Sequence, residues 1–297
     1  MTSNADVVAA STRSPAISRT VADLRRRVGA WRKDDLSVAL VPTMGYLHVA
    51  HVKLIERARV LCDRVVVSIF VNPAQFGEGE DFDHYPRDEA GDLAQLGAAR
   101  ADLAWMPSVA EMYPDGFATK VAVSGLTEGL CGAARPGHFD GVASVVTKLF
   151  LQCRPDVALF GEKDYQQLQM IRRMTTDLDI GVAIEAVATV READGLAISS
   201  RNVYLDADER ARAGRINKVL GETATDLAAG ADVAEAVARG RARLVAAGLE
   251  EIEYLELRDA ETLAPVSRLE HPARLLTAIQ MGRTRLIDNV PVTPPMI

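Results

Sequence analysis

The sequence predicts an α/β fold, in which a doubly wound parallel sheet is followed by a second, smaller α+β domain. Short apolar runs alternate with segments whose apolar residues recur three and four positions apart. The runs are typical of buried strands and the recurring spacing is typical of helices, so the alternation indicates successive βα units. Such units form a parallel sheet covered by helices. The alternation stops near Val190, which divides the chain into residues 1–189 and 190–297.

In the first domain each expected strand is followed by a loop or an expected helix. The strands cover residues 36–41, 65–71, 101–106, 157–160 and 183–190, and the helices cover residues 52–62, 88–99, 142–153 and 165–178. In the second domain the polar loop 191–202 leads to Asp206, whose carboxylate can cap the charged amphipathic helix that follows. An Ala-rich helix and three strands complete this domain, at residues 233–247, 252–257, 274–280 and 284–290.

Composition and charge exclude several classes of partner. The chain has 297 residues, of which 48% are hydrophobic and 25% charged, and a formal charge of −7. That charge argues against nucleic acid or an anionic membrane as a partner, because either would be repelled. Three cysteines without CxxC spacing indicate reduced thiols. With no apolar stretch of ~20 residues and a polar N-terminus, we expect a cytoplasmic protein whose first dozen residues form a loose tail.

Two histidines form the first candidate site. His48 and His51 lie three residues apart after the first strand, at the start of the expected helix. Positions i and i+3 share a helix face, and the first turn of a helix favours an anion. The pair therefore indicates a phosphate site. A partly buried core pair and a metal site remain as alternatives, although the zincin signature spaces its histidines at i and i+4 with a Glu between them.

Two further segments supply polar side chains beyond strand ends or before a helix. Asn72 and Gln75 follow the second strand, which Pro73 ends, so that two neutral amides can bind a hydroxyl or a carboxylate. Arg135 and His138 precede a helix and can contact a polyphosphate. The alternatives are an ordinary polar loop and a helix-entry turn with an exposed arginine.

The last two segments add a lysine and an arginine. Gly161, Lys163, Asp164 and Gln167 join the fourth strand to a helix, where lysine can bind phosphate and the polar side chains can fix hydroxyls. The segment 198–202 carries two serines and an arginine, which suit a mobile loop that closes over a triphosphate. An N-capping Asp beside a solvated Lys, and a Ser-rich turn, are the alternatives.

Together these segments resemble the pantothenate synthetase family, whose members are also called pantoate–beta-alanine ligases. The resemblance runs from about residue 38 to about residue 289 and rests on PTMG with HxxH, SIFVNPxQF, RPGHF, GEKDYQQL and SSRN. It implies a homodimer and a Rossmann-like N-terminal domain. It also implies membership of the nucleotidyltransferase superfamily, which has HIGH-type and KMSKS-type motifs.

The resemblance implies a two-step reaction. The carboxylate of (R)-pantoate attacks the α-phosphate of ATP, giving pantoyl adenylate and pyrophosphate. The amine of β-alanine then displaces AMP and forms pantothenate. Mg²⁺ accompanies ATP and is held mainly by phosphate oxygens, with no metal-binding protein residue implied. The partners implied are thus the small molecules pantoate, β-alanine and ATP.

The resemblance also assigns residues to ligands. The ATP site takes Met44, Gly45, Tyr46, Leu47, His48, Val49, Ala50, His51, Gly161, Glu162, Lys163, Asp164, Val190, Ile198, Ser199, Ser200 and Arg201. Among them His48, His51, Lys163, Ser199, Ser200 and Arg201 are the catalytic candidates. Among the substrate-binding residues, Gln75 and Gln167 bind pantoate, and Arg135 and His138 give a supporting contact on the phosphate side.

Three positions depart from the pattern of this family. Ala50 replaces the Gly of HxGH, and its methyl group is expected to crowd the adenine and to weaken ATP binding. Ala74 replaces a Met and is expected to loosen the pantoate pocket, and Gly91 occupies a position that is often acidic, which disfavours a second, protein-bound metal. The alternatives are another nucleotidyltransferase of the superfamily, a degenerate nucleotide-binding protein and, least favoured, a zinc hydrolase.

Overall fold

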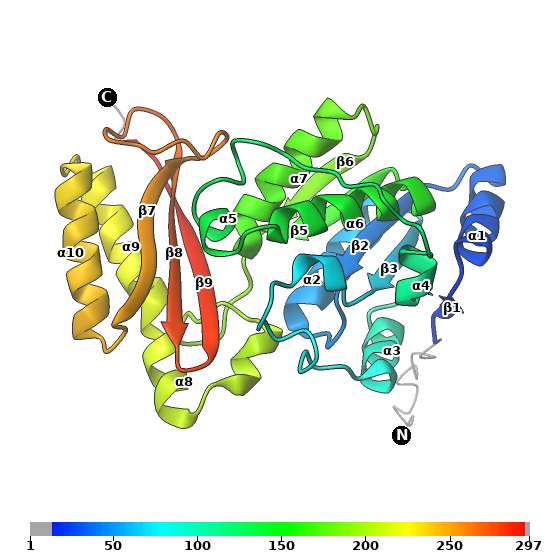
Figure 1. The fold of residues 1–297 in the computed structure, drawn as a ribbon, viewed down its shortest axis with the longest axis horizontal. Coiled ribbons are helices and arrows are strands. Elements are labelled where there is room, and N and C mark those ends of the chain that lie inside the picture. The colour runs from blue at the N-terminus through cyan, green and yellow to red at the C-terminus, as the bar shows by residue number, and fades with distance from the viewer. Residues whose placement is uncertain (1–13, 295–297) are drawn as a thin grey trace, which may run out of the picture.

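A computed structural model describes residues 14–294, so the expected N-terminal tail lies outside the described residues (Figure 1). Its larger sheet has six parallel strands in the order β1-β4-β3-β2-β5-β6. The strands are β1 (Ala16–Ser18), β2 (Val38–Thr43), β3 (Arg64–Ile69), β4 (Leu103–Trp105), β5 (Val157–Gly161) and β6 (Ala183–Val187). The predicted doubly wound parallel sheet is confirmed.

Helices cover both faces of this sheet because the strand residues alternate between two cores. Val38 and Leu40 pack with residues of α1, α6 and α7, whereas Ala39 and Val41 pack with residues of α2 and α3. The helices are α1 (Val21–Lys33), α2 (Val49–Leu61), α3 (Glu89–Ala98), α6 (His138–Cys153) and α7 (Tyr165–Asp177), with the short α4 (Val109–Met112) and α5 (Cys131–Ala134). None of the described helices is long and apolar enough to cross a membrane.

The chain changes direction across the sheet at β2. This strand pairs with β3 on one side and with β5 on the other, so the connections from β2 and β5 leave toward opposite sides. In open α/β sheets ligands bind beyond the carboxyl ends of the strands at such a point. The loops after Thr43 and Gly161 therefore flank the place where a ligand is expected.

Several element ends differ from those predicted, for reasons of pairing and capping. The predicted strand 183–190 ends at Val187 because its partner β5 ends at Gly161, which lies opposite Val187. The predicted strand 65–71 likewise ends at Ile69, opposite the last residue of β2. Helix α2 begins at Val49 rather than at residue 52, with His48 as its N-cap. Strand β1 and helix α1 were not predicted.

The C-terminal part forms a three-stranded antiparallel sheet with helices on one face. Its strands are β7 (Glu251–Asp259), β8 (Ala273–Met281) and β9 (Thr284–Val292). Its helices are α8 (Ala207–Ala213), α9 (Arg215–Ala228) and α10 (Val233–Ala246). Asp206 caps α8, as predicted, and does so through a capping box with Glu209. The predicted charged helix is divided at Gly214, where α8 ends and α9 begins.

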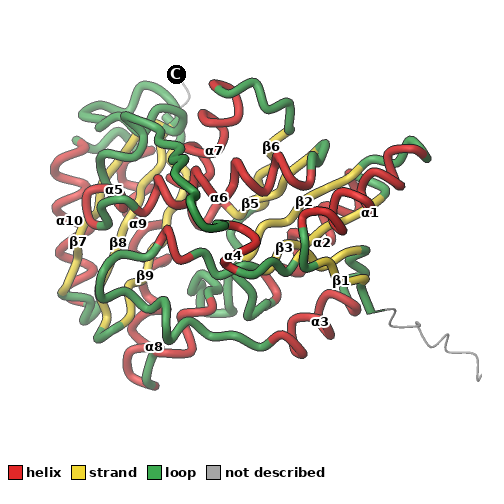
Figure 2. The backbone as a smooth tube through the Cα atoms, turned by 45° about the vertical axis from the view of Figure 1, so that its right-hand side comes forward, coloured by secondary structure: helices red, strands yellow, loops and turns green. Residues whose placement is uncertain are grey.

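The two sheets lie side by side in the molecule. Figures 1 and 2 place β7–β9 between α9 and α10 on one side and the region of α5–α7 on the other. Tyr254, Leu276 and Ala278 from this sheet belong to the same buried cluster as α6 and α7. The smaller sheet is thus packed against helices that cover the larger one.

One close backbone contact fixes the loop after β3. This loop contains a 3₁₀ turn, η1 (Pro73–Gln75), which lies on α6 at Gly141. A Cβ atom added to Gly141 would lie 2.1 Å from the carbonyl oxygen of Ala74. The Asn72 side chain also donates a hydrogen bond to the Gly141 carbonyl, at 3.1 Å. Glycine at position 141 therefore allows the loop to approach the helix.

We predict that Gly141→Ala lowers the free energy of unfolding by about 1–3 kcal/mol, because the added methyl group must push η1 away from α6. Urea denaturation measures the change. Gly221→Ala is a matched control, since Gly221 is also helical but exposed, with no atom within 4 Å of an added Cβ. The control is expected to be neutral or stabilised by about 0.5–1 kcal/mol. Equal stabilities for both variants would contradict the prediction.

Candidate active site

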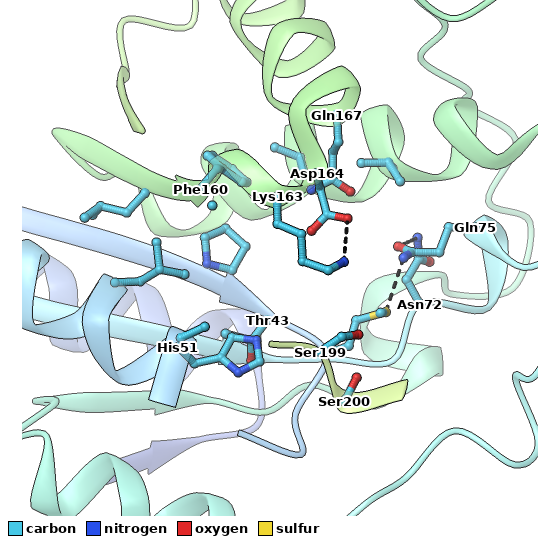
Figure 3. A pocket seen from close by; sticks show the side chains of 18 of the residues that line it. Thr43, His51, Asn72, Gln75, Phe160, Lys163, Asp164, Gln167, Ser199 and Ser200 are labelled. Atoms are coloured by element: carbon cyan, nitrogen blue, oxygen red, sulfur yellow. Dashed lines mark hydrogen bonds and ion pairs between the residues drawn. The ribbon is translucent and has the colours of Figure 1, made fainter. Parts of the chain in front are cut away.

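A cavity of about 250 Å³ lies beyond the carboxyl ends of β2 and β5 and is lined by all five segments singled out in the sequence. Figure 3 labels residues from four of these segments. The predicted site residues among the lining of the cavity are Met44, His48, Ala50, His51, Asn72, Gln75, Arg135, His138, Gly161, Lys163, Asp164, Gln167, Val190, Ile198, Ser199, Ser200 and Arg201. The fold thus brings together side chains that are far apart in the sequence.

The two histidine rings stack at the N-terminus of α2. Their centroids are 4.0 Å apart, and the backbone N–H of His48 donates to Nδ1 of His51 at 3.2 Å. Burial, with the neighbouring His48 and Lys163, lowers the pKa of His51 to about 3. Burial and Lys163 lower the pKa of His48 to about 4. Both rings are therefore neutral at pH 7, and His51 carries its proton on Nε2 because Nδ1 accepts a hydrogen bond.

The turn before His48 is held from behind by α3. Gly45 and Tyr46 have φ values of 83° and 50°, a left-handed turn that directs backbone N–H groups toward α3. The buried Asp92 carboxylate accepts from Tyr46 N at 3.0 Å and from Leu47 N at 2.6 Å. Burial raises the pKa of Asp92 and outweighs the opposing effect of these two bonds. The turn residues thus shape the site while their N–H groups face away from it.

Two amide side chains lie at the two ends of η1 and differ in their freedom. Asn72 is 1% exposed, donates to Gly141 and accepts from the Tyr113 hydroxyl at 2.8 Å. Gln75 accepts at Oε1 from Nδ2 of Asn72 at 3.1 Å, and its amide nitrogen donates to the weak acceptor Sδ of Met44 at 3.2 Å. Asn72 is therefore a fixed part of the loop, whereas Gln75 has hydrogen-bonding capacity for a ligand. The side chain of Ala74 is exposed and is not among the residues that line the cavity.

The loop after β5 presents a lysine to the cavity. Figure 3 shows the Lys163 side chain between His51 on one side and Gln75 on the other. Its Nζ lies 3.6 Å from Oδ1 of Asp164. Glu162, by contrast, points to the smaller sheet, where its carboxylate accepts from Nη2 of Arg274 at 3.0 Å. The loop therefore offers Lys163, Asp164 and its backbone to a ligand, but not the Glu162 carboxylate.

Arg135 and His138 contact each other and the loop that carries Asn72 and Gln75, called the amide loop below. The Arg135 guanidinium pairs with both oxygens of Glu80 at 2.7 and 2.6 Å, and its Nη1 lies 3.0 Å from Nε2 of His138. Burial and Arg135 lower the pKa of His138 to about 4. The neutral ring thus accepts from Arg135 and donates from Nδ1 to the Gln75 carbonyl, at 2.8 Å. Both residues hold Gln75 in place.

The SSRN segment, residues 199–202, is held by hydrogen bonds against the loop that follows η1. Arg201 pairs with both oxygens of Asp81, at 2.9 Å each, and lies over the Tyr85 ring. The Tyr85 hydroxyl is 3.0 Å from Oγ of Ser200, the first residue of the 3₁₀ turn η3 (Ser200–Tyr204). Loop 191–202 is therefore closed over the cavity by contacts with residues 81–85.

The sequence did not single out Glu80, Asp81, Tyr85 or Asp92. These residues act through their contacts with motif residues and have no motif of their own. For Glu80 and Asp81 the sequence does contain a signal, because the acidic stretch at residues 78–83 complements the arginines of RPGHF and SSRN. Asp92 gives no such signal, because an acidic residue in the first turn of a helix is ordinary.

Comparisons with known proteins point to one family. A family model described as Pantoate-beta-alanine ligase matches residues 16–291. The chain is 57% identical over 278 residues to a pantothenate synthetase of Paramagnetospirillum magneticum, a match that covers 94% of this chain and 98% of the relative. It is 55% identical over 282 residues to a pantothenate synthetase of a Chelativorans species, covering 95% and 99%.

Solved structures agree. A pantothenate synthetase from Thermus thermophilus matches with a TM-score of 0.89 and 48% identity, covering 94% of this chain and 100% of that one. A Francisella tularensis pantoate–beta-alanine ligase, described as complexed with beta-gamma ATP and beta-alanine, matches with a TM-score of 0.79 and 30% identity, covering 93% and 97%. Fold, site segments and relatives agree, and the chain belongs to the pantoate–beta-alanine ligase family.

Proposed function

We propose that this chain condenses (R)-pantoate with β-alanine, using ATP, and releases pantothenate, AMP and pyrophosphate. The observation that carries the proposal is the cavity in which Lys163 and two neutral histidines face the amide of Gln75, whose N–H groups have only a weak sulfur acceptor. The first three groups suit a phosphate, and the amide suits a small hydroxy acid. The relatives named pantothenate synthetase, and the ligase described with ATP and β-alanine, support the same reaction.

In the first step a pantoate carboxylate oxygen bonds to the α-phosphorus of ATP while the bond to the bridging oxygen of pyrophosphate breaks. Negative charge grows on the departing pyrophosphate. The Lys163 ammonium stabilises it, and neutral His51 donates a hydrogen bond from Nε2. His48 is the second imidazole donor. No protein nucleophile takes part, so the protein contributes position and charge stabilisation.

In the second step the β-alanine amine attacks the acyl carbon of the adenylate, and the bond from that carbon to the AMP oxygen breaks. The amine loses one proton as the amide forms. Gln75 and Gln167 position the pantoyl group and Gln75 also lies near the amine. Ser199, Ser200 and Arg201 form the closing loop, in which Arg201 exchanges its Asp81 partner for phosphate oxygens.

We propose that ATP binds with Mg²⁺, which neutralises phosphate charge. Asp164 is the one carboxylate among the cavity-lining residues, and no group of three His, Cys, Asp or Glu side chains within residues 14–294 is arranged to hold a metal. Such a donor set fits an ion that would be held mainly by phosphate oxygens and water rather than by protein side chains. We also propose that the protein is cytoplasmic and that it forms a homodimer. Analytical sedimentation measures the oligomeric state.

The proposed reaction predicts an exchange of label between pyrophosphate and ATP that needs pantoate but not β-alanine. Lys163→Met is expected to lower the exchange rate by roughly 10²–10³-fold, because the charge on the leaving group loses its ammonium partner. Lys53→Met is the control, since Lys53 is exposed on α2 and, among the described residues, pairs with Glu56. Exchange without pantoate, or none from the folded wild-type chain, would refute the proposed function.

The neutral histidines predict a specific dependence of stability on pH. Burial lowers the pKa of His51 to about 3 in the folded chain, against 6.5 for a free histidine, so between these values the unfolded chain binds more protons. The free energy of unfolding should therefore rise with pH up to about 6.5 and then become flat. This single residue is expected to contribute up to about 2 kcal/mol between pH 5 and pH 7.

Urea denaturation at several pH values measures this contribution. His51→Gln should flatten the rise between pH 5 and pH 7, whereas His84→Gln, at an exposed site, should leave it unchanged. A slope that His51→Gln does not alter would show that the pKa of the ring is the same in the folded and the unfolded chain, and would contradict the lowered pKa on which this prediction rests.

Ala50 predicts a gain of affinity on substitution. It lines the cavity from the first turn of α2, where the pattern of the family has Gly. If its methyl group crowds the adenine, Ala50→Gly should lower the KM for ATP by about tenfold, which corresponds to ~1.4 kcal/mol. The helix itself should lose about 1 kcal/mol. Ala234→Gly, at the same position of α10, measures that helix cost alone. An unchanged KM would disprove crowding.

A further inference from the structure

The smaller sheet touches the lysine loop through one buried side chain. Asn289 lies in β9 and is 2% exposed. Its Nδ2 donates to the carbonyl oxygens of Glu162 at 3.0 Å and Lys163 at 2.9 Å. Its Oδ1 accepts from Nε of Arg274 at 2.5 Å. Both ends of the amide are thus occupied, and its orientation is fixed with the nitrogen toward the loop.

Arg274 strengthens the same connection. Its side chain is 8% exposed, its Nη2 pairs with the Glu162 carboxylate, and its guanidinium lies 4.3 Å from the centroid of the Tyr165 ring. Glu162 is therefore held at its carbonyl by Asn289 and at its carboxylate by Arg274. The residue that precedes Lys163 has no freedom to rotate without breaking buried polar bonds.

The loop itself has little internal support. It consists of the three-residue 3₁₀ turn η2 (Glu162–Asp164), which has no side-chain cap. Within the cavity the Lys163 ammonium has a partner only at 3.6 Å, in Asp164. The direction in which the lysine side chain leaves the backbone is thus set mainly by the bonds from β8 and β9.

Asp288, the residue before Asn289 in β9, holds the second loop of the proposed ATP site, residues 191–202. Asp288 pairs with Arg191 through both oxygens, at 2.7 and 2.9 Å. Arg191 begins the segment that leads to SSRN and donates to the Gly195 carbonyl at 3.0 Å. Two consecutive residues of one strand therefore fix the two loops that carry Lys163 and Arg201.

We propose that Asn289 is a positioning residue for the adenylation step and acts through Lys163. Its amide holds the Glu162 and Lys163 carbonyls so that the ammonium lies where the pyrophosphate departs. The inference rests on the proposed function, and it assigns to the smaller sheet a part in the chemistry of the larger one. A displacement of about 1 Å at such a site costs up to about 10²-fold in rate.

Asn289→Asp tests the proposal selectively. The carboxylate can still accept from Arg274, but it cannot donate to the two loop carbonyls. We expect the kcat of pantoate-dependent pyrophosphate–ATP exchange to fall by about 10- to 100-fold. Thr277→Val is the matched control, because Thr277 is 1% exposed in the same sheet and loses one buried bond, to the Tyr254 carbonyl. Its kcat should stay within about twofold of wild type.

Measuring Asn289→Asp in the Lys163→Met variant separates a positioning role of Asn289 from general destabilisation of the fold. If Asn289 acts through the ammonium, Asn289→Asp should lower the residual exchange of Lys163→Met by less than about threefold, because the group it positions is gone. An equal fold-loss in both backgrounds, or an unchanged kcat in Asn289→Asp alone, would overturn the inference.

Two further outcomes are distinguishable. Should Asn289→Asp fail to fold, as judged by circular dichroism, Arg274→Lys tests the same bond from its other end, since it keeps the charge but loses the planar fork that orients the amide. The same dependence on Lys163 is expected of it, and its absence would overturn the inference. Failure of the wild-type chain to exchange would instead refute the proposed function.

Discussion

The pairing of β2 with β5 is the constraint on which the rest of the structure depends. Ala39 and Leu40 lie opposite Val157 and Ala158, so the ends of two strands that are far apart in sequence become neighbours. The chain leaves them in opposite directions, toward α2 and toward η2. The space that opens between these two connections is the cavity, with His51 on one side and Lys163 on the other.

The cavity gathers basic side chains although the chain as a whole is acidic. The chain carries −7 overall, yet the cavity collects Lys163, Arg135 and Arg201. Both arginines already have carboxylate partners, Glu80 and Asp81, while the lysine is only loosely paired. An incoming polyphosphate therefore meets one available cation directly and must compete with acidic side chains for the others.

The fold was largely predictable because buried strands and amphipathic helices leave a periodic signal. Strand ends were not, since they depend on where a partner strand stops, as at Val187. Strand β1 has three residues and α1 buries only Leu24 and Val28 fully, too little for a pattern to reveal. The motif residues were brought together as expected, but their supports came from contacts between distant segments, which periodicity does not encode. The boundary at residue 190 and the roles of the site residues stay predictions.

The contact between α6 and η1 constrains the residue type at position 141 but not at position 74. Gly141 meets the carbonyl of Ala74, not its side chain, which is exposed. Position 74 can therefore drift among residue types over evolutionary time without disturbing the amide loop, whereas position 141 admits no alternative while that loop keeps its place. A mutational library across both positions would record this asymmetry as a broad set of functional residues at one and a single residue at the other.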